Sequence, residues 1–172
     1  QIAYSNSSDA PPASAQINWT FNDGNSGSQG SGGALTATGS TTVTITGVND
    51  VPTLTNLSGD SLAYSEGAGA VVIEQGANVL VADIDSSNFD TGTLTISIPS
   101  GGDSAEDVLS IRNQGTGAGQ IGVSGSTISY EGTAIGTFTG GSGGSNLVIT
   151  LNSSADATTV TALIKNITYA NT

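Results

Sequence analysis

Carboxylate side chains are the groups in this sequence with the clearest capacity for chemistry. Asp83 and Asp85 follow an alternating segment, residues 79–82, that predicts a strand. Both carboxylates should leave the same side of the chain, because successive side chains of an extended backbone alternate. Two hard oxygen donors at one place suit Ca²⁺, which takes six to eight oxygen ligands in proteins.

Other oxygen donors fall in stretches that predict turns, where they could complete a calcium shell: Asp23, Asn49, Asp50, Glu66 and Asp90. A separate acidic stretch, GGDSAED, offers Asp103, Glu106 and Asp107 as a further calcium candidate. The alternative interpretation is that Asp and Asn occur here simply because they form turns.

The charge balance limits the partners of the chain. Fourteen acidic side chains face only two basic ones, Arg112 and Lys165, which gives a formal net charge of −12. Two cations cannot form the basic patch that nucleic acid requires, so nucleic acid is excluded as a partner. The same deficit argues against anionic membrane surfaces. Acidic groups without basic partners face water or bind cations, and Ca²⁺ is the ordinary cation of oxygen-rich sites.

Most catalytic chemistry is missing from the sequence. Cys and His are absent, which excludes a thiol nucleophile, a Ser-His-Asp triad and the usual zinc site. Paired carboxylates could hydrolyse a glycoside, but carboxylates concentrated in turns and few aromatic residues speak against a sugar cleft. We therefore expect no enzyme. The sequence also contains no apolar run near ~18 residues and no leader, so we expect a mature or excised segment that does not insert into a membrane.

Aromatic residues leave a second kind of binding open. Trp19 and the four tyrosines Tyr4, Tyr64, Tyr130 and Tyr169 could form a platform on which carbohydrate rings stack. Trp19, however, lies in an alternating apolar series with Ala15, Ile17 and Phe21, which favours a core position. We expect a core containing Trp19, Phe21, Ile96, Ile98, Val148 and Leu151.

The elements that must position these residues are predicted to be short strands. Gly is frequent, charged residues make up 9%, and alternating segments recur with turn residues between them, as in a β-sandwich. The predicted strands are 15–21, 34–46, 53–57, 70–74, 79–82, 93–98, 108–112, 120–124, 127–130, 134–138 and 146–151. The segment 34–46 predicts either one long strand or a bent pair of strands. One segment has helical spacing instead, with Val160, Leu163, Ile164 and Ile167 on one face. It predicts a short structural helix over 157–165, capped by Ser154 or Asp156.

A junction interrupts the strand pattern in TVTITGVNDVPTL, which spans residues 42–54. Asn49 and Asp50 end one alternating run. Pro52 removes a backbone donor and holds Val51 extended, so 49–52 predicts a short, stiff joint between two β units.

An internal repeat accompanies this joint. Residues 1–7, QIAYSNS, align with residues 166–172, NITYANT, at an offset of 165 residues. This match predicts a tandem array in which residues 1–5 and 166–170 occupy the same strand position. On that interpretation 1–48 holds the last strands of one repeat, 49–52 is the joint, and 53–172 is the body of the next repeat.

Eight segments follow one another along the chain: FNDGN, TVTITGVNDVP, GDSLAYSEGAGAVVI, VADIDSSNFDTGTLTISI, AEDVLSI, GQIGVSG, IGTFTGG and ALIKNITYANT. In the order and spacing of these segments, the sequence resembles the cadherin-like, VCBS-type tandem repeats of very large secreted bacterial proteins, including adhesins and biofilm proteins of the RTX class. TGGSGGSN lacks the aspartate of the RTX nonapeptide, so the calcium β-roll itself is not expected. The resemblance implies an all-β fold of Ig/cadherin-like sandwich repeats, with interdomain Ca²⁺ held by Glu66, Asp83, Asp85, Asn49 and Asp50.

Two functions follow as hypotheses. The first is a structural repeat of a secreted or cell-surface adhesin or matrix fibre, with calcium at the joints and neighbouring copies of the repeat as partners. The second is a calcium-dependent carbohydrate-binding module of a larger secreted protein, with a polysaccharide as its partner.

Overall fold

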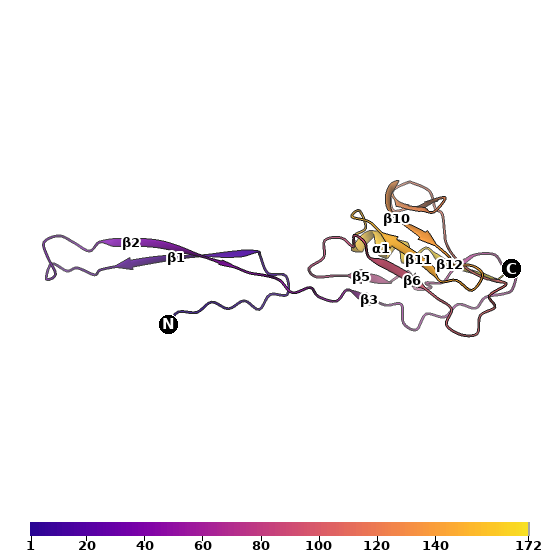
Figure 1. Cartoon of the computed structure of the whole chain (residues 1–172), viewed down its shortest axis with the longest axis horizontal. Coiled ribbons are helices and arrows are strands. Elements are labelled where there is room, and N and C mark those ends of the chain that lie inside the picture. The colour runs from indigo at the N-terminus through magenta and orange to yellow at the C-terminus, as the bar shows by residue number, and fades with distance from the viewer. Residues whose placement is uncertain (172) are drawn as a thin grey trace. The chain divides into compact units, whose positions relative to one another are not determined.

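The computed structural model describes residues 1–171, and the chain divides into two compact units, Gln1–Asp50 and Val51–Thr172. The described residues form twelve strands and one helix, and every strand pairing is antiparallel (Figure 1). The protein is therefore mainly β, as predicted. No helix among residues 1–171 has the length and apolar character needed to cross a membrane.

The first unit contains a single long hairpin. Strand β1 (Ser14–Asn22) pairs with β2 (Thr36–Thr44) over nine residues in unbroken register, from Ser14 opposite Thr44 to Asn22 opposite Thr36. Because residues opposite each other share a face, Ile17, Trp19 and Phe21 lie on the same side as Val43 and Ala37. Asn and Thr side chains occupy the other side. The hairpin thus has one apolar and one polar face.

The second unit contains three sheets and the helix. A five-stranded sheet has the order β6-β11-β10-β9-β8, a three-stranded sheet has the order β4-β12-β7, and β3 pairs with β5. The strands are β3 (Thr53–Thr55), β4 (Val71–Val72), β5 (Leu80–Ala82), β6 (Thr93–Ile96), β7 (Asp107–Ile111), β8 (Ile121–Ser124), β9 (Thr127–Tyr130), β10 (Thr133–Thr139), β11 (Leu147–Leu151) and β12 (Ile167–Asn171).

Turn chemistry explains how the five-stranded sheet closes its hairpins. Glu131 and Gly132 alone connect β9 to β10, and both have positive φ, 51° and 82°. A two-residue turn of this kind matches the twist of antiparallel strands, whereas a common type I turn would splay them. The sequence places a glycine at one of the two positions, which keeps the conformational cost low.

The predicted helix is present as α1 (Ala157–Ile164), with Asp156 as its N-cap and Lys165 as its C-cap. The Asp156 side chain accepts a hydrogen bond from the Thr159 N–H at 2.8 Å, and Thr159 Oγ1 accepts one from the Asp156 N–H at 2.9 Å. This reciprocal capping box satisfies two donors at the start of the helix. Of the two predicted caps, Asp156 is the correct one.

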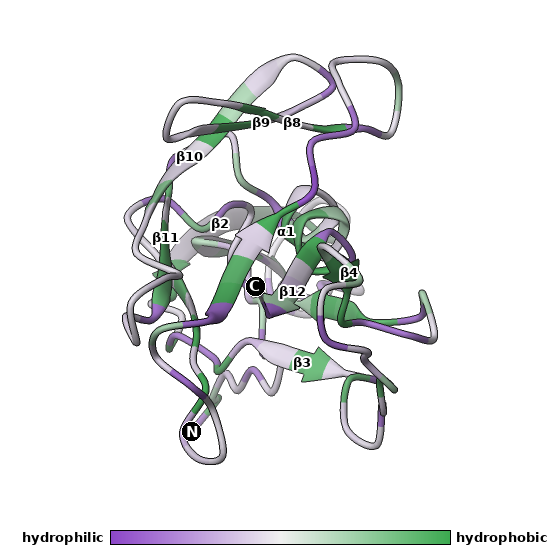
Figure 2. Ribbon diagram, turned by 90° about the vertical axis from the view of Figure 1, so that its right-hand side faces the viewer, coloured by the Kyte–Doolittle hydropathy of each residue, from purple (hydrophilic) through white to green (hydrophobic). Residues whose placement is uncertain are grey.

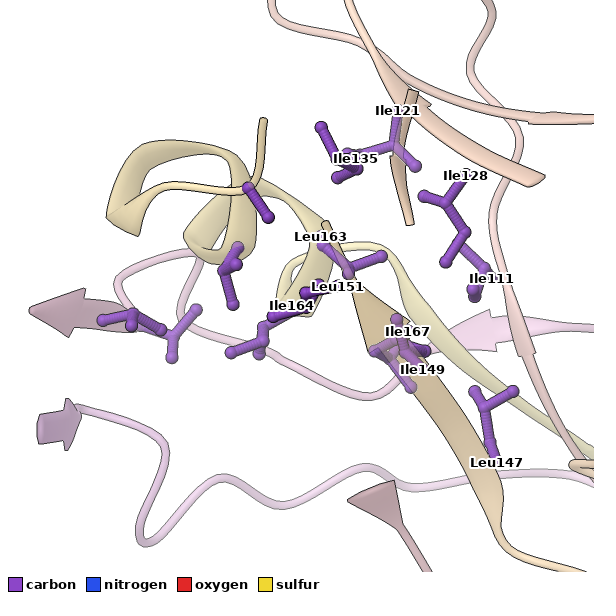
Figure 3. Close-up of a cluster of buried hydrophobic side chains, with 14 of the residues drawn as sticks. Ile111, Ile121, Ile128, Ile135, Leu147, Ile149, Leu151, Leu163, Ile164 and Ile167 are labelled. Atoms are coloured by element: carbon purple, nitrogen blue, oxygen red, sulfur yellow. The ribbon is translucent and has the colours of Figure 1, made fainter. Parts of the chain in front are cut away.

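The core of the second unit lies between α1 and the strands around it. Ile121, Ile128, Leu147, Ile149 and Leu163 have no exposed surface. Figure 3 shows Leu163 and Ile164 of α1 meeting isoleucine and leucine side chains from β8, β9, β10 and β11, and Figure 2 shows hydrophobic residues concentrated along α1 and neighbouring strands. One continuous cluster therefore holds the helix onto the sheets.

The predicted core is wrong at three of its six positions. Leu151 is buried as predicted and Ile96 and Val148 are half-buried, but Trp19, Phe21 and Ile98 are exposed, with exposed fractions of 41%, 70% and 39%. Ile98 lies two residues beyond the end of β6, outside the sheet. Trp19 and Phe21 do lie on the apolar face of a strand, but their unit consists of two strands only, so no second layer covers that face.

The two ends of the predicted repeat differ in secondary structure. Residues 166–170 fall largely within β12, which pairs with β4 and β7. Residues 1–5, predicted to occupy the same position, lie outside any strand, because their unit contains no counterparts of β4 and β7. Thr172, which the alignment pairs with Ser7, lies outside the described residues.

Candidate functional site

The Asp83 and Asp85 carboxylates lie together at the end of β5, as the alternation predicts. Asp83 Oδ1 accepts hydrogen bonds from the N–H groups of Asp85 at 3.2 Å and Ser86 at 3.1 Å. Partial burial raises the pKa of Asp83, but hydrogen bonds from Asp85 and Ser86 outweigh that effect and hold the pKa below its usual value. The loop thus keeps Asp83 ionised, which a cation ligand requires.

Asp23 closes the loop of the β1–β2 hairpin. Its Oδ1 accepts from the N–H groups of Leu35 at 2.9 Å and Asn25 at 3.1 Å, and its own N–H donates to the Leu35 carbonyl at 3.1 Å. The Leu35 hydrogen bond, followed by that of Asn25, lowers the pKa of Asp23. These contacts give the carboxylate a structural role that the turn interpretation anticipated.

The remaining predicted ligands lie in turns or loops of their own units. Asn49 Nδ2 donates to the Asp50 carbonyl at 3.0 Å. Glu66 is exposed on a turn, and the Asp90 N–H donates to Asn88 Oδ1 at 3.1 Å. Asn49 and Asp50 belong to the first unit, whereas Glu66, Asp85 and Asp90 belong to the second.

The predicted ligands are therefore brought together only as the pair Asp83 and Asp85. Within residues 1–171, no group of three or more carboxylates is close enough to hold a metal ion. A calcium shell around the pair would need further oxygens, either from water or from groups that approach only when the ion binds.

Asp107 anchors a polar cluster that the sequence pattern did not reveal. It is 8% exposed, and its Oδ1 accepts from the Tyr169 hydroxyl at 2.5 Å and from Asn171 Nδ2 at 2.9 Å. Oδ2 accepts from the Asp103 N–H at 2.7 Å. The hydrogen bonds from Asn171, Tyr169 and Asp103 lower the pKa of Asp107, and its carboxylate raises the pKa of Tyr169.

In the GGDSAED stretch, which the sequence offered as a calcium candidate, Asp107 has a structural role. Asp107 joins β7 to β12 through side chains that lie 62 and 64 residues away in the sequence. Both carboxylate oxygens already accept protein hydrogen bonds, so Asp107 is suited to holding two strands together. Sequence spacing carries no signal for such distant partners.

Two tyrosines of the proposed sugar platform belong to the same cluster. Tyr64 and Tyr169 meet edge to face with ring centroids 4.9 Å apart. The Tyr64 hydroxyl accepts from the Asn171 N–H at 3.0 Å and donates to the Gly69 carbonyl at 3.0 Å. Both hydroxyls are thus engaged within the fold.

The second unit also contains an open apolar groove. We call it the β3–β6 groove. It has a volume of about 380 Å³ and is lined by Leu54, Val81, Phe89, Leu94, Val160 and Ile164. A neighbouring hollow of about 300 Å³ shares Leu54, Leu94 and Ile164 with it and adds Leu57, Ile73 and Ile96. Leu54 is half exposed, so apolar surface faces water here.

Comparison with known protein families, with curated proteins and with solved structures gave no match. The function proposed for the chain therefore depends on its own residues and geometry.

Proposed function

We propose that the chain is a structural tandem repeat of a secreted bacterial adhesin or extracellular matrix fibre, in which Ca²⁺ stiffens the joints between β-sandwich domains. In this proposal 1–48 contributes the last strands of one cadherin-like sandwich and 53–172 forms the body of the next. The location is the cell surface or the extracellular matrix, as in the VCBS-type repeats that the sequence resembles.

One observation carries this proposal: each unit has apolar β-structure that its own strands leave uncovered. The hairpin exposes Trp19 and Phe21, and the second unit exposes Leu54 in its groove. A two-stranded hairpin is marginal in water by itself, so it needs a packing partner. The repeat at an offset of 165 residues accounts for both the exposed hairpin face and the open groove, because in an array successive copies would cover them.

The acidic charge of the chain and the oxygen ligands at the joint support the calcium part of the proposal. Asp83 and Asp85 present adjacent carboxylates, and a net charge of −12 gives the cation a favourable field. Asn49, Asp50 and Glu66 would complete the ligand set when neighbouring domains meet, and Asp23 and Asp90 are the further predicted ligands in loops of their own units. Binding to the folded state alone would stabilise it by mass action.

Thermal melts in excess Ca²⁺ and in chelator test the calcium part. Wild type should melt at a higher temperature with calcium, and Asp83→Ala should lose that difference because the pair is broken. Ser87→Ala is a control that alters an exposed residue of the same loop outside the predicted ligand set. Superimposable melts of wild type with and without Ca²⁺ would sink the calcium proposal.

The carbohydrate-binding module remains a second candidate because Trp19 is exposed, as a stacking residue must be. A glycan array with the whole chain separates the two functions. Saturable binding to a polysaccharide that is lost in Trp19→Ala would favour the module over the fibre.

A further inference from the structure

We infer that the β3–β6 groove is a docking site for the apolar face of the β1–β2 hairpin of a second copy of this chain. This inference deepens the proposed function and rests on it only in taking the partner to be another copy of the repeat.

The groove has the chemistry of an unfilled core. Its lining is almost entirely apolar, and Val160 and Ile164 of α1 belong both to the lining and to the main core cluster. A filler would therefore extend the existing core instead of making a separate contact. The groove volume of about 380 Å³ lies in the range of sites that enclose sizeable ligands, so it has room for large side chains.

The edges beside the groove are also incomplete. Among the described residues, β6 ends the five-stranded sheet and pairs only with β11, while β3 pairs only with β5. Leu94 of β6 and Leu54 of β3 both line the groove, so these two edges border it. A strand laid between them would gain backbone hydrogen bonds as well as apolar contacts, which is the general mode of strand addition.

The hairpin has the matching properties. Its β1 face carries Ile17, Trp19 and Phe21 at alternating positions, and the opposing β2 residues Val43 and Ala37 extend that face. Phe21 is 70% exposed in its own unit. A long, regular, amphipathic hairpin of this kind would bury its apolar face against another β-layer or a helix, and the groove offers both.

The sequence repeat identifies the occupant as a second copy. Residues 1–7 resemble 166–172, so in an array a copy of Ser8 follows Thr172 and a copy of β1 begins seven residues further along. Seven extended residues span at most about 25 Å. A hairpin so tethered stays within this reach of the end of β12. Ile167 lies four residues before that end, a span of about 13 Å, and it lines the hollow that adjoins the groove, so the tether can reach the groove region.

Docking of one copy's hairpin into another copy's groove is a head-to-tail contact, which generates open chains of copies, or rings if the rotation closes. The whole 172-residue chain should therefore self-associate with rising concentration in sedimentation velocity. Trp19 is the only tryptophan, so its fluorescence should become shielded from quencher as association proceeds.

Two aspartate substitutions block the two halves of the contact. Leu54→Asp places a charge in the groove, and Phe21→Asp places one on the hairpin face; each should weaken association by about 30-fold or more. Leu80→Asp is the matched control for Leu54→Asp. Leu80 is 52% exposed against 51% for Leu54 and lies on the opposite face of the same two-stranded sheet. Thr20→Asp, on the polar face of β1, is the control for Phe21→Asp.

Mixing the two blocked variants gives the decisive result. Leu54→Asp keeps an intact hairpin and Phe21→Asp keeps an intact groove, so an equimolar mixture should form one-to-one pairs while each variant alone stays monomeric. Pair formation also shows that both variants fold. The inference is overturned if the mixture stays monomeric, if Leu80→Asp disrupts association as much as Leu54→Asp, or if wild type is monomeric at all concentrations.

A monomer with shielded Trp19 would mean that each hairpin fills the groove of its own chain, which also overturns the second-copy assignment. The calcium melts decide the proposed joint separately, since they do not depend on association. Failure of one proposal is thus distinguishable from failure of the other.

Discussion

Replacing Leu163 with alanine is the sharpest test of how the second unit is held together. Leu163 is fully buried on α1 and belongs to the cluster that joins the helix to the sheets (Figure 3). The substitution deletes three carbon atoms and leaves a cavity, because rigid neighbours on both sides cannot close in fully. Leu-to-Ala changes at such sites cost about 2.7–5 kcal/mol.

The size of the unit converts this cost into a melting temperature. Unfolding entropy near 60 °C is about 2.1 cal/mol/K per residue, so a unit of about 120 residues has a value near 0.25 kcal/mol/K. A loss of about 3–5 kcal/mol then lowers the midpoint by roughly 12–20 °C. Differential scanning calorimetry or far-ultraviolet circular dichroism measures the shift.

Two controls define what the shift means. Thr158→Ala lies on the exposed side of the same helix and should change the midpoint by no more than about 2 °C, because only helix propensity changes. Trp19→Ala, at concentrations too low for association, should leave the melt of the second unit unchanged. A Leu163→Ala midpoint within 3 °C of wild type would refute the assignment of this core.

Four further predictions concern the polar network, the helix cap and one glycine. Asp107 has a lowered pKa, so the stability that it contributes is present above its unfolded pKa of about 3.9 and is lost as pH falls through the folded pKa. Asp107→Asn should therefore reduce the fall in melting temperature at acid pH. Tyr169 has a raised pKa, so its share is lost as pH rises above about 10, and Tyr169→Phe should flatten that limb. Asp156→Ala should cost about 1 kcal/mol in denaturant unfolding because the capping box is lost, with Asp156→Asn as the tolerated control. Gly141→Ala should destabilise strongly in the same assay, because φ is +92° and the new Cβ would overlap the Leu109 carbonyl oxygen.

The strand pattern was predictable because it is local. Each alternating segment that predicts a strand overlaps a strand of the structure, although most observed strands are shorter. The helical spacing after Asp156 located α1 within one residue. Alternation and helical spacing report which side chains share a face, and they depend only on neighbours in the sequence.

Whether another element packs on the apolar face of a strand was not predictable, because this depends on the tertiary arrangement of elements that are distant in the sequence. Trp19 and Phe21 have the pattern of a buried strand, yet they lie on a hairpin whose unit has no second layer. The Asp107 network was missed for a similar reason. Its partners Tyr169 and Asn171 come from β12, whose position beside β7 follows from sheet topology and not from spacing. The DxD pair was found because its two carboxylates are close neighbours in one loop.

The distribution of charge bears on how copies with a net charge of −12 could associate at all. Like charges oppose the approach of two copies, so a contact surface must keep carboxylates away from the buried area. The β3–β6 groove has no charged lining residue, and the adjoining hollow has only Glu74. Glu74 is buried and its Oε1 accepts from the N–H groups of Asn78 and Val79, so the fold already engages it. The predicted calcium ligands lie instead in loops and at the joint, where a cation would offset the repulsion that the groove avoids. In the proposed assembly, docking at the groove would therefore bury no uncompensated carboxylate, and the proposed calcium binding at the joint would not depend on that docking.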